Sequence, residues 1–478
     1  MLRRVLVANR GEIAARILRA CREMNIETVA VFSEADRGFL FTTLATHAVC
    51  IGGPAPRDSY LNQDAILTVA QHYDCDAIHP GFGFLSENAA FAQRVRDLGI
   101  IFVGPSPEVI ARLGDKSAAR ELMRAQGVSV VPGSEGCVST VEEARACAEA
   151  IGYPVLLKAT AGGGGRGMRR VFEPQELQAA FDAAQAEAFT CFGDKSLYLE
   201  KLILNPRHVE VQILADSHGS IVHLGDRDCS LQRNHQKLLE EAPAPSLSDA
   251  TRKRMAADAL RAAQAVGYEN AGTVEFVVTG SGAVGSAARN AEDGFEQEAE
   301  DCAFYFIEMN TRIQVEHPIT EMVTGINIVR EQLRIAAGLP LSFQQEDAAI
   351  KGHAIECRIN AEDPRQDFRP CPGTIDYLHL PSGFGIRVDT VIHPQYQITP
   401  YYDSMIAKII VHGRNRNEAI CRMRRALEET LVAGVSTTIP LHYMLMYDPD
   451  FISNHIDTGF IERKLPTLLR PLSEGAML

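Results

Sequence analysis

A lysine followed closely by a run of glycines is the first pattern in this sequence with a clear chemical use. Lys158 closes the apolar run YPVLLK, and residues 161–168 read AGGGGRGM. Glycine has no Cβ, so its amides can approach an anion closely, and Lys158 and Arg166 add positive charge. The segment predicts a lid over nucleotide phosphates, with an ordinary surface loop as the alternative. It is neither a Walker A loop nor a Rossmann fingerprint, because GxxxxGK[ST] and a helix-opening GxGxxG are absent.

Two further segments offer oxygen ligands for a metal ion. Glu275 lies in GTVEFVV, and Glu308 and Asn310 lie in FYFIEMN, and both segments read as strands. Positions i and i+2 of a strand share a face, so Glu308 and Asn310 should point the same way. Carboxylates among valine, phenylalanine and isoleucine are costly unless they are paired or bound to a metal. Oxygen ligands suit Mg²⁺ or Mn²⁺. Pairing with arginine is the alternative, and the nearby phosphate-binding loop favours the metal.

The next segment, TRIQVEHP, combines a cation, an amide and a carboxylate. In an extended chain Arg312, Gln314 and Glu316 fall on one face. This combination suits a small anion with a removable proton, because the arginine can hold the charge while the carboxylate takes the proton.

A short basic stretch, RDCSLQRNHQKLLEEAPAP, lies between the glycine run and the metal strands. It contains Arg227, Arg233, His235 and Lys237. Its simplest interpretation is an exposed charged loop. The net charge of −14 makes such a local group of cations notable.

Length and composition exclude several classes of protein. A chain of 478 residues predicts about two or three domains. The net charge of −14 disfavours a general role in binding nucleic acid. Eleven cysteines without a CxxC pair argue against a disulfide framework and a zinc site. No signal-peptide core opens the chain, and no stretch of about 18 apolar residues could span a membrane. We expect a soluble cytoplasmic protein, or one inside an organelle after removal of a transit peptide.

The order of predicted elements must bring these residues together. Over the first 110 residues, short apolar strands alternate with amphipathic helices, which predicts a Rossmann-like parallel α/β sheet. Residues 280–303 are small, polar and acidic, and predict an excursion from a hairpin tip, with a plain loop favoured over a partner-binding element. Helices are expected near 249–266, 321–337 and 416–431. The predicted domains are 1–113, 114–338 with a lid over 131–203, and 339–460.

The full set of motifs resembles the biotin carboxylase family of the ATP-grasp superfamily. VANRGEIA, IHPGFGFLSEN, the GGGGRGM loop, YLEK, RDCS-QR-HQK, EEAPAP, FIEMNTRIQVEHP and PYYDSMIAK follow in order from about residue 3 to 460. RDCS-QR-HQK and MNTRIQVEHP distinguish this branch from other ATP-grasp ligases. The resemblance implies a Rossmann-like domain, an ATP-grasp domain with a glycine-rich lid and a mixed C-terminal domain. It also implies carboxylation of biotin by bicarbonate through carboxyphosphate, with ATP and Mg²⁺ or Mn²⁺ (two ions expected).

The resemblance also implies a role for each matching residue. Glu316 resembles the base that deprotonates bicarbonate, and Arg358 the residue that stabilises the enolate form of biotin. Glu275, Glu308 and Asn310 match the metal ligands. The bicarbonate site would contain Lys237, Arg312, Gln314 and Val315 beside Glu316. ATP would be bound by Lys116, Lys158, Gly163, Gly164, Gly165, Arg166, Gly167, Met168, Glu200, Lys201, Leu202, His208, Gln232, His235, Glu275 and Glu308, with the adenine at 200–202.

Three departures from the family pattern qualify these expectations. Ala161 stands where the family commonly has a further glycine, and alanine tolerates positive φ poorly, so lid kinetics or nucleotide affinity should differ. Residues 280–303 lengthen the connection between the metal strands, usually a short turn in the family. The chain carries no AMKM-like biotin-attachment sequence and no carboxyltransferase region.

The third departure predicts one subunit of a multi-protein carboxylase. Its partners would be a biotin carboxyl carrier protein and carboxyltransferase subunits, and it should form a homodimer through its first helix and C-terminal domain. Acetyl-CoA carboxylase, in fatty-acid synthesis, is the expected holoenzyme. The alternatives are another acyl-CoA or 2-oxo-acid carboxylase, a different ATP-grasp ligase, and an inactive nucleotide-binding scaffold.

Overall fold

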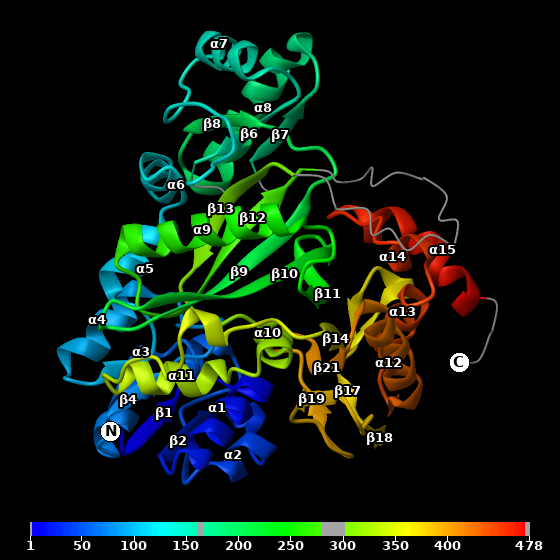
Figure 1. The fold of residues 1–478 in the computed structure, drawn as a ribbon. Coiled ribbons are helices and arrows are strands. Elements are labelled where there is room, and N and C mark those ends of the chain that lie inside the picture. The colour runs from blue at the N-terminus through cyan, green and yellow to red at the C-terminus, as the bar shows by residue number, and fades with distance from the viewer. Residues whose placement is uncertain (1, 161–166, 280–301, 474–478) are drawn as a thin grey trace.

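The computed structural model describes residues 2–160, 167–279 and 302–473, and its first part is a five-stranded parallel sheet (Figure 1). Val5 and Val7 pack with helix α1 (Gly11–Glu23) on one face, and Leu6 packs on the other with α3 (Gln63–His72) and α4 (Ala89–Asp97). The predicted parallel α/β region is confirmed. The strand order is β3-β2-β1-β4-β5, with β1 Arg4–Val7, β2 Glu27–Phe32, β3 His47–Cys50, β4 Ala77–His79 and β5 Ile101–Phe102.

The loops that follow β1 and β4 meet at the carboxyl edge of this sheet. Asn9, after β1, donates from Nδ2 to the carbonyl oxygens of Pro80 at 2.6 Å and Phe82 at 2.8 Å, after β4. Neighbouring parallel strands end at the same edge, where such sheets present ligand-binding side chains. Both loops therefore form one rim.

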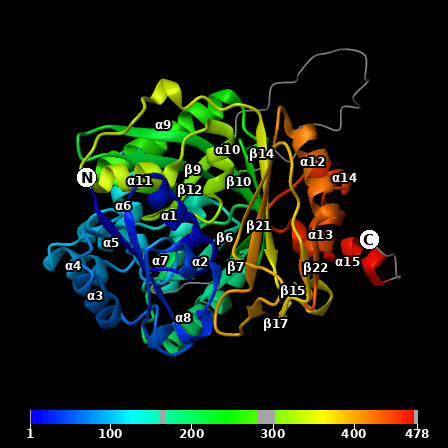
Figure 2. The same ribbon diagram turned by 90° about the horizontal axis from the view of Figure 1, so that it is seen from below.

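The second sheet has eight antiparallel strands and runs through both the central and the final parts of the chain (Figure 2). Helix α9 (Asp249–Val266) packs on one face of its central strands, and α10 (His317–Thr324) contacts β10, β11, β14 and β21. The strand order is β13-β12-β9-β10-β11-β14-β21-β19, with β9 Arg207–Ala215, β10 Ile221–Arg233, β11 Gln236–Ala242, β12 Asn270–Val278, β13 Phe304–Asn310, β14 His353–Asn360, β19 Ile386–Thr390 and β21 Met405–Gly413.

Alternation along β14 sends its side chains to two different layers. Ile355, Cys357 and Ile359 join the core beneath α12 (Arg416–Glu429), whereas Ala354 packs with α10. Successive residues of a strand point to opposite faces, so Glu356 and Arg358 lie on the α10 side. This is the face that carries the ionisable groups of the site.

The three predicted helices compare with the structure in different ways. The helices expected near 249–266 and 416–431 are confirmed as α9 and α12. The single helix expected near 321–337 is wrong, because α10 ends at Thr324, its C-cap Gly325 has a φ of +74°, and Asn327 caps α11 (Ile328–Ala336). The break places α10 against the eight-stranded sheet, while α11 contacts α1 and β12.

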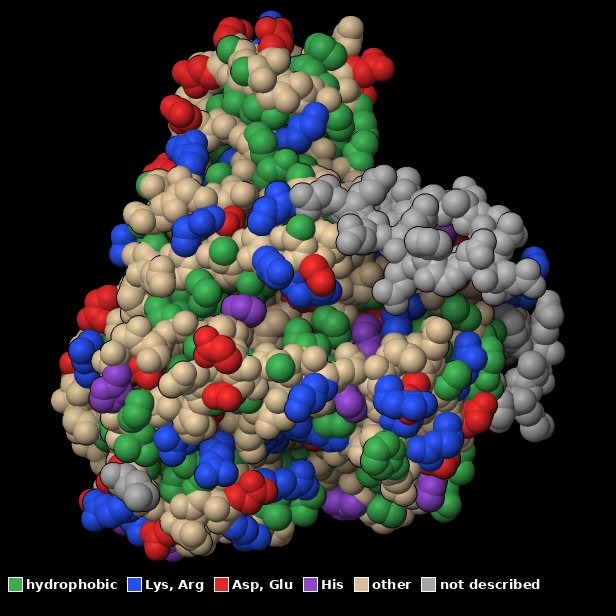
Figure 3. All heavy atoms as spheres, in the orientation of Figure 1, with side chains coloured by type: hydrophobic (Ala, Val, Ile, Leu, Met, Phe, Trp, Pro, Cys, Tyr) green, Lys and Arg blue, Asp and Glu red, His purple; other side chains and the backbone are tan. Residues whose placement is uncertain are grey.

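Residues around the glycine run form a small three-stranded sheet with two helices, which stands out from the body (Figures 1 and 3). It has an apolar cluster of its own, and β6 pairs with β7 in a register that sets Lys158 opposite Met168. Ala161 and residues 280–301 lie outside the described residues. The elements are α7 Val141–Ile151, β6 Val155–Ala159, β7 Met168–Val171, α8 Leu177–Phe192 and β8 Leu197–Lys201.

The remaining elements are short connections and a C-terminal helical layer. Among the described residues, every helix is too short or too polar to cross a bilayer. These elements are α2 Leu40–Leu44, α5 Pro107–Gly114, α6 Lys116–Ala125, α13 Ile439–Leu445, α14 Pro449–Ile452, α15 Phe460–Ser473, β15 Glu362–Asp363, β16 Arg369–Pro370, β17 Gly373–Thr374, β18 Tyr377–His379, β20 Gln397–Ile398 and β22 Leu431–Ala433.

Phe276 supplies a test of the core between α9 and the sheet. It is fully buried and packs edge-to-face against Phe304, with ring centroids 5.5 Å apart. We expect Phe276→Ala to lower the free energy of unfolding by about 3–5 kcal/mol, because the cavity adds to the lost burial. Urea denaturation measures this loss. The control is Phe189→Ala on α8, where the ring is 55% exposed, and an equal loss in both variants would contradict the prediction.

Candidate active site

The predicted site residues meet in one cleft of about 1640 Å³ between the parallel sheet, the small three-stranded unit and the eight-stranded sheet. Of those that the structure describes, all line the cleft except Gly167 and Glu316. Gly163, Gly164, Gly165 and Arg166 lie outside the described residues. Gly167 accepts a backbone hydrogen bond from Ala159 at 2.9 Å, which closes the strand pair at the base of the glycine run.

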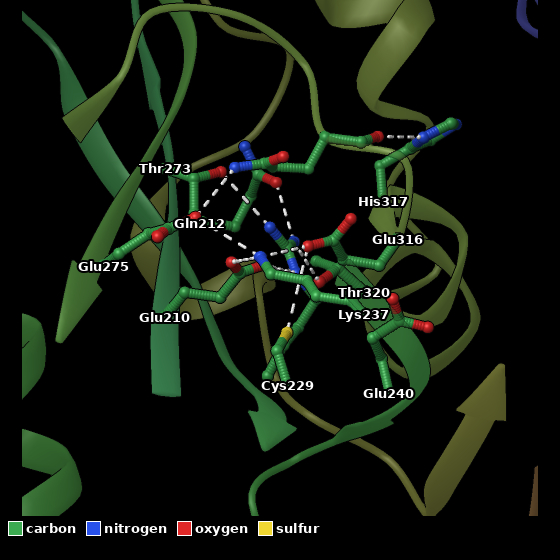
Figure 4. Close-up of polar contacts among 12 residues, drawn as sticks. Glu210, Gln212, Cys229, Lys237, Glu240, Thr273, Glu275, Glu316, His317 and Thr320 are labelled. Atoms are coloured by element: carbon green, nitrogen blue, oxygen red, sulfur yellow. Dashed lines mark hydrogen bonds and ion pairs between the residues drawn. The ribbon is translucent and has the colours of Figure 1, made fainter. Parts of the chain in front are cut away.

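Lys237 and Glu316 form the centre of the site (Figure 4). Lys237 Nζ donates to Glu316 Oε1 and Glu210 Oε2, each at 2.7 Å, and to Glu275 Oε1 at 3.2 Å. Arg358 Nη2 donates to Glu316 Oε2 at 2.8 Å. Glu316 is buried, so it reaches the cleft only past two cations that line the wall.

These cations decide the protonation of Glu316. Burial alone would raise the pKa of its carboxyl, but Lys237, Arg358 and Arg227 outweigh burial and hold the pKa well below its usual range. Glu316 is therefore ionised and can accept a proton. Such a group can act as a base toward an anion that the same cations attract.

Arg227 lies beneath this centre and corrects the exposed-loop interpretation of the basic stretch. Its side chain is fully buried on β10 and donates to Glu210 Oε1 at 2.5 Å, Gln212 Oε1 at 2.8 Å and Thr320 Oγ1 at 2.9 Å. The loop interpretation is wrong because the stretch is a hairpin of β10 and β11. Only residues 234–236, at and next to its turn, are exposed, and His235 is one of them.

The extended conformation predicted for TRIQVEHP is also wrong. Residues 311–316 form an irregular turn, and Glu316 stands at the N-terminus of α10. Arg312 Nη1 donates to Gln314 Oε1 at 2.8 Å, whereas Glu316 turns toward Lys237. Arg312 and Gln314 still line the cleft, and Glu316 lies behind Lys237 and Arg358, which line its wall.

The predicted metal ligands lie on two adjacent antiparallel strands. Glu275 of β12 is opposite Glu308 of β13, and a bulge at this point inserts Ile307 as an extra residue. Asn310 Nδ2 donates to Glu275 Oε1 at 2.8 Å. Two carboxylates and an amide oxygen are hard donors of the kind that Mg²⁺ prefers, so this set fits the ion.

Cations of the chain contact both carboxylates. Lys116 Nζ lies 2.7 Å from Glu308 Oε2, and His208 Nε2 lies 3.2 Å from Glu275 Oε2. Burial would lower the pKa of His208, but the charge of Glu275 overcomes it and the pKa is raised. Both acids therefore already attract positive charge.

The predicted adenine site lies at the end of β8. Lys158 forms an ion pair with Glu200, and Lys201 Nζ donates to the carbonyl oxygens of Gly152 and Tyr153, each at 2.9 Å. The Leu202 amide donates to Pro154 O at 3.0 Å, so a base that bonds to this amide must replace that contact.

Several residues of the site were given no role from the sequence. Glu87, in the rim after β4, accepts from Arg312 Nε at 2.9 Å. Lys408 is fully buried and donates to Val315 O at 2.8 Å. Glu240 accepts from Arg358 Nε at 2.6 Å. Glu87, Lys408 and Glu240 sit within quoted motifs, yet only the assembled fold shows which cation or carbonyl each one contacts.

Comparison with known proteins agrees with this geometry. Three family models match: biotin carboxylase, N-terminal domain, over residues 1–110; carbamoyl-phosphate synthase L chain, ATP binding domain, over 115–284 and 286–344; and biotin carboxylase C-terminal domain over 356–463. Biotin carboxylase 1 of Bacillus subtilis is 51% identical over 97% of this chain and 98% of its own. The chain belongs to the biotin carboxylase family. It is thus an ATP-dependent ligase, and the resemblance read from the motifs is confirmed.

Other relatives show the range of the biotin carboxylase family. A pyruvate carboxylase subunit of Methanothermobacter thermautotrophicus is 50% identical, over 97% of this chain and 90% of its own. The biotin carboxylase domain dimer of Hydrogenobacter thermophilus 2-oxoglutarate carboxylase, solved with MgADP, ADP and bicarbonate, matches with a TM-score of 0.87. It is 47% identical and covers 98% of each chain.

Substitution of Arg227 tests whether its buried ion pair and hydrogen bonds stabilise the site. We expect Arg227→Met to lower the free energy of unfolding by about 3–5 kcal/mol, because it leaves Glu210 as a buried charge with one partner fewer. Chemical denaturation measures the change. The matched control is Arg3→Met, whose side chain is 82% exposed beside Asp76 and should cost less than about 1 kcal/mol. Equal stability of the two variants would refute the role given to Arg227.

Proposed function

We propose that this chain catalyses the ATP-dependent carboxylation of biotin by bicarbonate, with Glu316 as the base. The observation that carries the proposal is the buried Glu316 carboxylate, held between Lys237 and Arg358 at the wall of the cleft. A base flanked by two cations suits an anion that must lose a proton, and membership of the biotin carboxylase family supports that substrate.

In the first step, bicarbonate lies beside Lys237, Arg312 and Gln314. Glu316 takes the proton of its hydroxyl group while one oxygen attacks the γ-phosphorus of ATP. The bond between that phosphorus and the bridging oxygen breaks, and its electron pair leaves with ADP. The products are ADP, carboxyphosphate and a neutral Glu316.

The phosphates of ATP would be bound by two further lysines of the same cleft. Lys116 and Lys158 line the cleft there, and ordered cations cost little reorganisation as charge develops. Mg²⁺, held by Glu275, Glu308 and Asn310, would neutralise charge on the transferred phosphoryl group. His208, Gln232 and His235 are proposed to contact the nucleotide, and 200–202 its adenine.

In the second step, carboxyphosphate breaks down to carbon dioxide and phosphate next to biotin. The phosphate takes the N–H proton of the ureido ring, and the ring nitrogen attacks carbon dioxide. Arg358 would hold the ureido oxygen while it carries negative charge. An arginine suits this role because its guanidinium stays protonated.

The partners of the reaction follow from the biotin substrate. We propose a separate biotin carboxyl carrier protein and carboxyltransferase subunits, a homodimer, and acetyl-CoA as the final acceptor. We also propose the division into domains 1–113, 114–338 and 339–460, which the ranges of the three family models support. Because one relative belongs to a pyruvate carboxylase, a 2-oxo acid is the second candidate for the acceptor. Reconstitution with each carboxyltransferase separates the two.

Glu316→Gln tests the base directly. ADP release by the wild-type chain with Mg·ATP should require bicarbonate and rise when free biotin is added. In the variant we expect this rate to fall by about 10²–10⁴-fold, because the amide cannot take a proton. A coupled ADP assay measures both. Glu346→Gln, at an exposed position, is the control and should keep the full rate. Turnover that ignores biotin would indicate a different ATP-grasp ligase, and no turnover an inactive scaffold.

Glu308→Gln tests the metal site. The variant keeps the shape of the side chain but loses a negative donor, so we expect the Mg²⁺ concentration for half-maximal ADP release to rise by about tenfold or more. Titration of Mg²⁺ at fixed ATP measures this. Chelation of the ion should abolish turnover in the wild type. An unchanged Mg²⁺ requirement in the variant would remove Glu308 from the ligand set.

A further inference from the structure

Two buried glutamates face each other directly behind Arg358. Glu240 of β11 and Glu356 of β14 are opposite partners in the antiparallel register, and both side chains are fully buried. Directly opposed residues on one face of such a pair have Cβ atoms about 4.5–5.5 Å apart. Two ionised carboxylates on such neighbouring side chains would repel each other, and burial makes their charges more costly.

The two carboxyl groups have few hydrogen-bond partners among the described residues. Glu240 Oε1 accepts from Arg358 Nε, but Glu240 Oε2 and both oxygens of Glu356 accept nothing there. Glu241, the next residue of β11, is the contrast. It is buried as well, but it accepts from Arg416 at 2.7 and 2.9 Å and lies 2.7 Å from His353 Nε2. β11 thus carries a fully paired carboxylate, Glu241, next to Glu240, whose carboxyl group accepts hydrogen bonds from Arg358 alone.

The charged groups around Glu240 and Glu356 show why few cations are available to these two carboxyl groups. Burial raises the pKa of Glu356, and Lys408 is the cation that most opposes this effect, but its ammonium group contacts Glu12 at 3.0 Å and Val315 O. Arg358 is shared with Glu316, and Lys237 serves three other carboxylates. Two buried thiols lie nearby: Cys229 on β10 senses the charge of Glu240, and Cys357 lies on the opposite face of β14 from Glu356.

We propose that Glu240 is a positioning residue for Arg358, and that the Glu240–Glu356 pair carries one proton, on Glu356, while the enzyme works. The inference rests on the proposed function. At rest, Arg358 is held by two carboxylates, Glu240 and Glu316. When Glu316 takes the proton of bicarbonate it becomes neutral, and its ion pair with Arg358 is lost. Glu240 alone then holds the guanidinium at the wall, where the ureido oxygen of biotin gains its negative charge.

The titration of the pair agrees with this division of roles. Burial raises the pKa of Glu356 well above its usual range. Burial also raises the pKa of Glu240 to about 7, against the lowering effect of Arg358. Since Glu240 is ionised only above this value, acid protonates it and removes its hold on Arg358. The biotin-dependent rate should therefore fall as pH falls through about 7.

The test compares two activities of the full chain, using Mg·ATP, saturating bicarbonate and free biotin. ADP release without biotin measures the first step, in which Glu316 is the base. The increase in ADP release that biotin causes measures the second step, in which Arg358 holds the ureido oxygen. We expect Glu240→Gln to reduce the biotin-dependent increase by about tenfold or more, the effect of one lost charged hydrogen bond. ADP release without biotin should stay within about threefold, and the acid fall in the biotin-dependent rate should disappear.

Glu356→Gln is the matched variant, because an amide imitates a protonated carboxyl group. Both activities should stay within about threefold of the wild type, and the biotin-dependent rate should still decrease as pH falls through about 7. Equal losses in the two variants, a uniform loss of both activities in Glu240→Gln, or an acid fall that persists in Glu240→Gln would each overturn the inference. If Glu240→Gln does not fold, Glu240→Asp replaces it. Its shorter carboxylate should lower the biotin-dependent increase and keep the acid fall, and a full biotin response would overturn the inference. If biotin does not increase ADP release by the wild-type chain, the proposed function is wrong instead.

Discussion

The buried ion cluster around Lys237 is the interaction on which the rest of the site depends. One ammonium group contacts Glu210, Glu275 and Glu316, which come from β9, β12 and the start of α10. Buried charges are tolerated only when their partners are fixed, so the cluster requires each of these elements at its place. Arg227 completes it from below, since its guanidinium contacts Glu210 and a threonine of α10. The helix, the sheet and Glu316, the proposed base, are therefore held by one set of ion pairs.

Within and next to this cluster, glutamates differ in how readily they are protonated. Three cations outweigh burial at Glu316 and hold its pKa well below the usual range, whereas burial raises the pKa of Glu240 and of Glu356 and the cations there do not offset it. Separation of pKa values among neighbouring carboxyl groups is how a protein assigns a base and a proton store within a few ångströms. In this chain the separation follows from strand register, which sets how many cations each carboxyl group meets.

The eight-stranded sheet explains how distant parts of the chain contribute to one small site. It carries Glu275 and Lys237 on its central strands and Arg358 on a strand from the final third of the sequence. The parallel sheet adds Glu87, which fixes Arg312 from the opposite wall. Neither the two strands with the proposed metal ligands nor the turn with Arg312 and Gln314 would form a site without this continuity.

The sequence by itself determined the family, the order of the chemical motifs and the alternation of parallel strands and helices at the N-terminus. These features are local, because a motif or a hydrophobic period is complete within a few residues. It also placed Glu275 and Glu308 on two strands correctly. Only the tertiary structure decided that Arg227 is buried rather than exposed, that Glu316 turns away from Arg312, and that Glu240 opposes Glu356. Each of these depends on which strand lies beside which, and in what register, and a single sequence does not state that pairing.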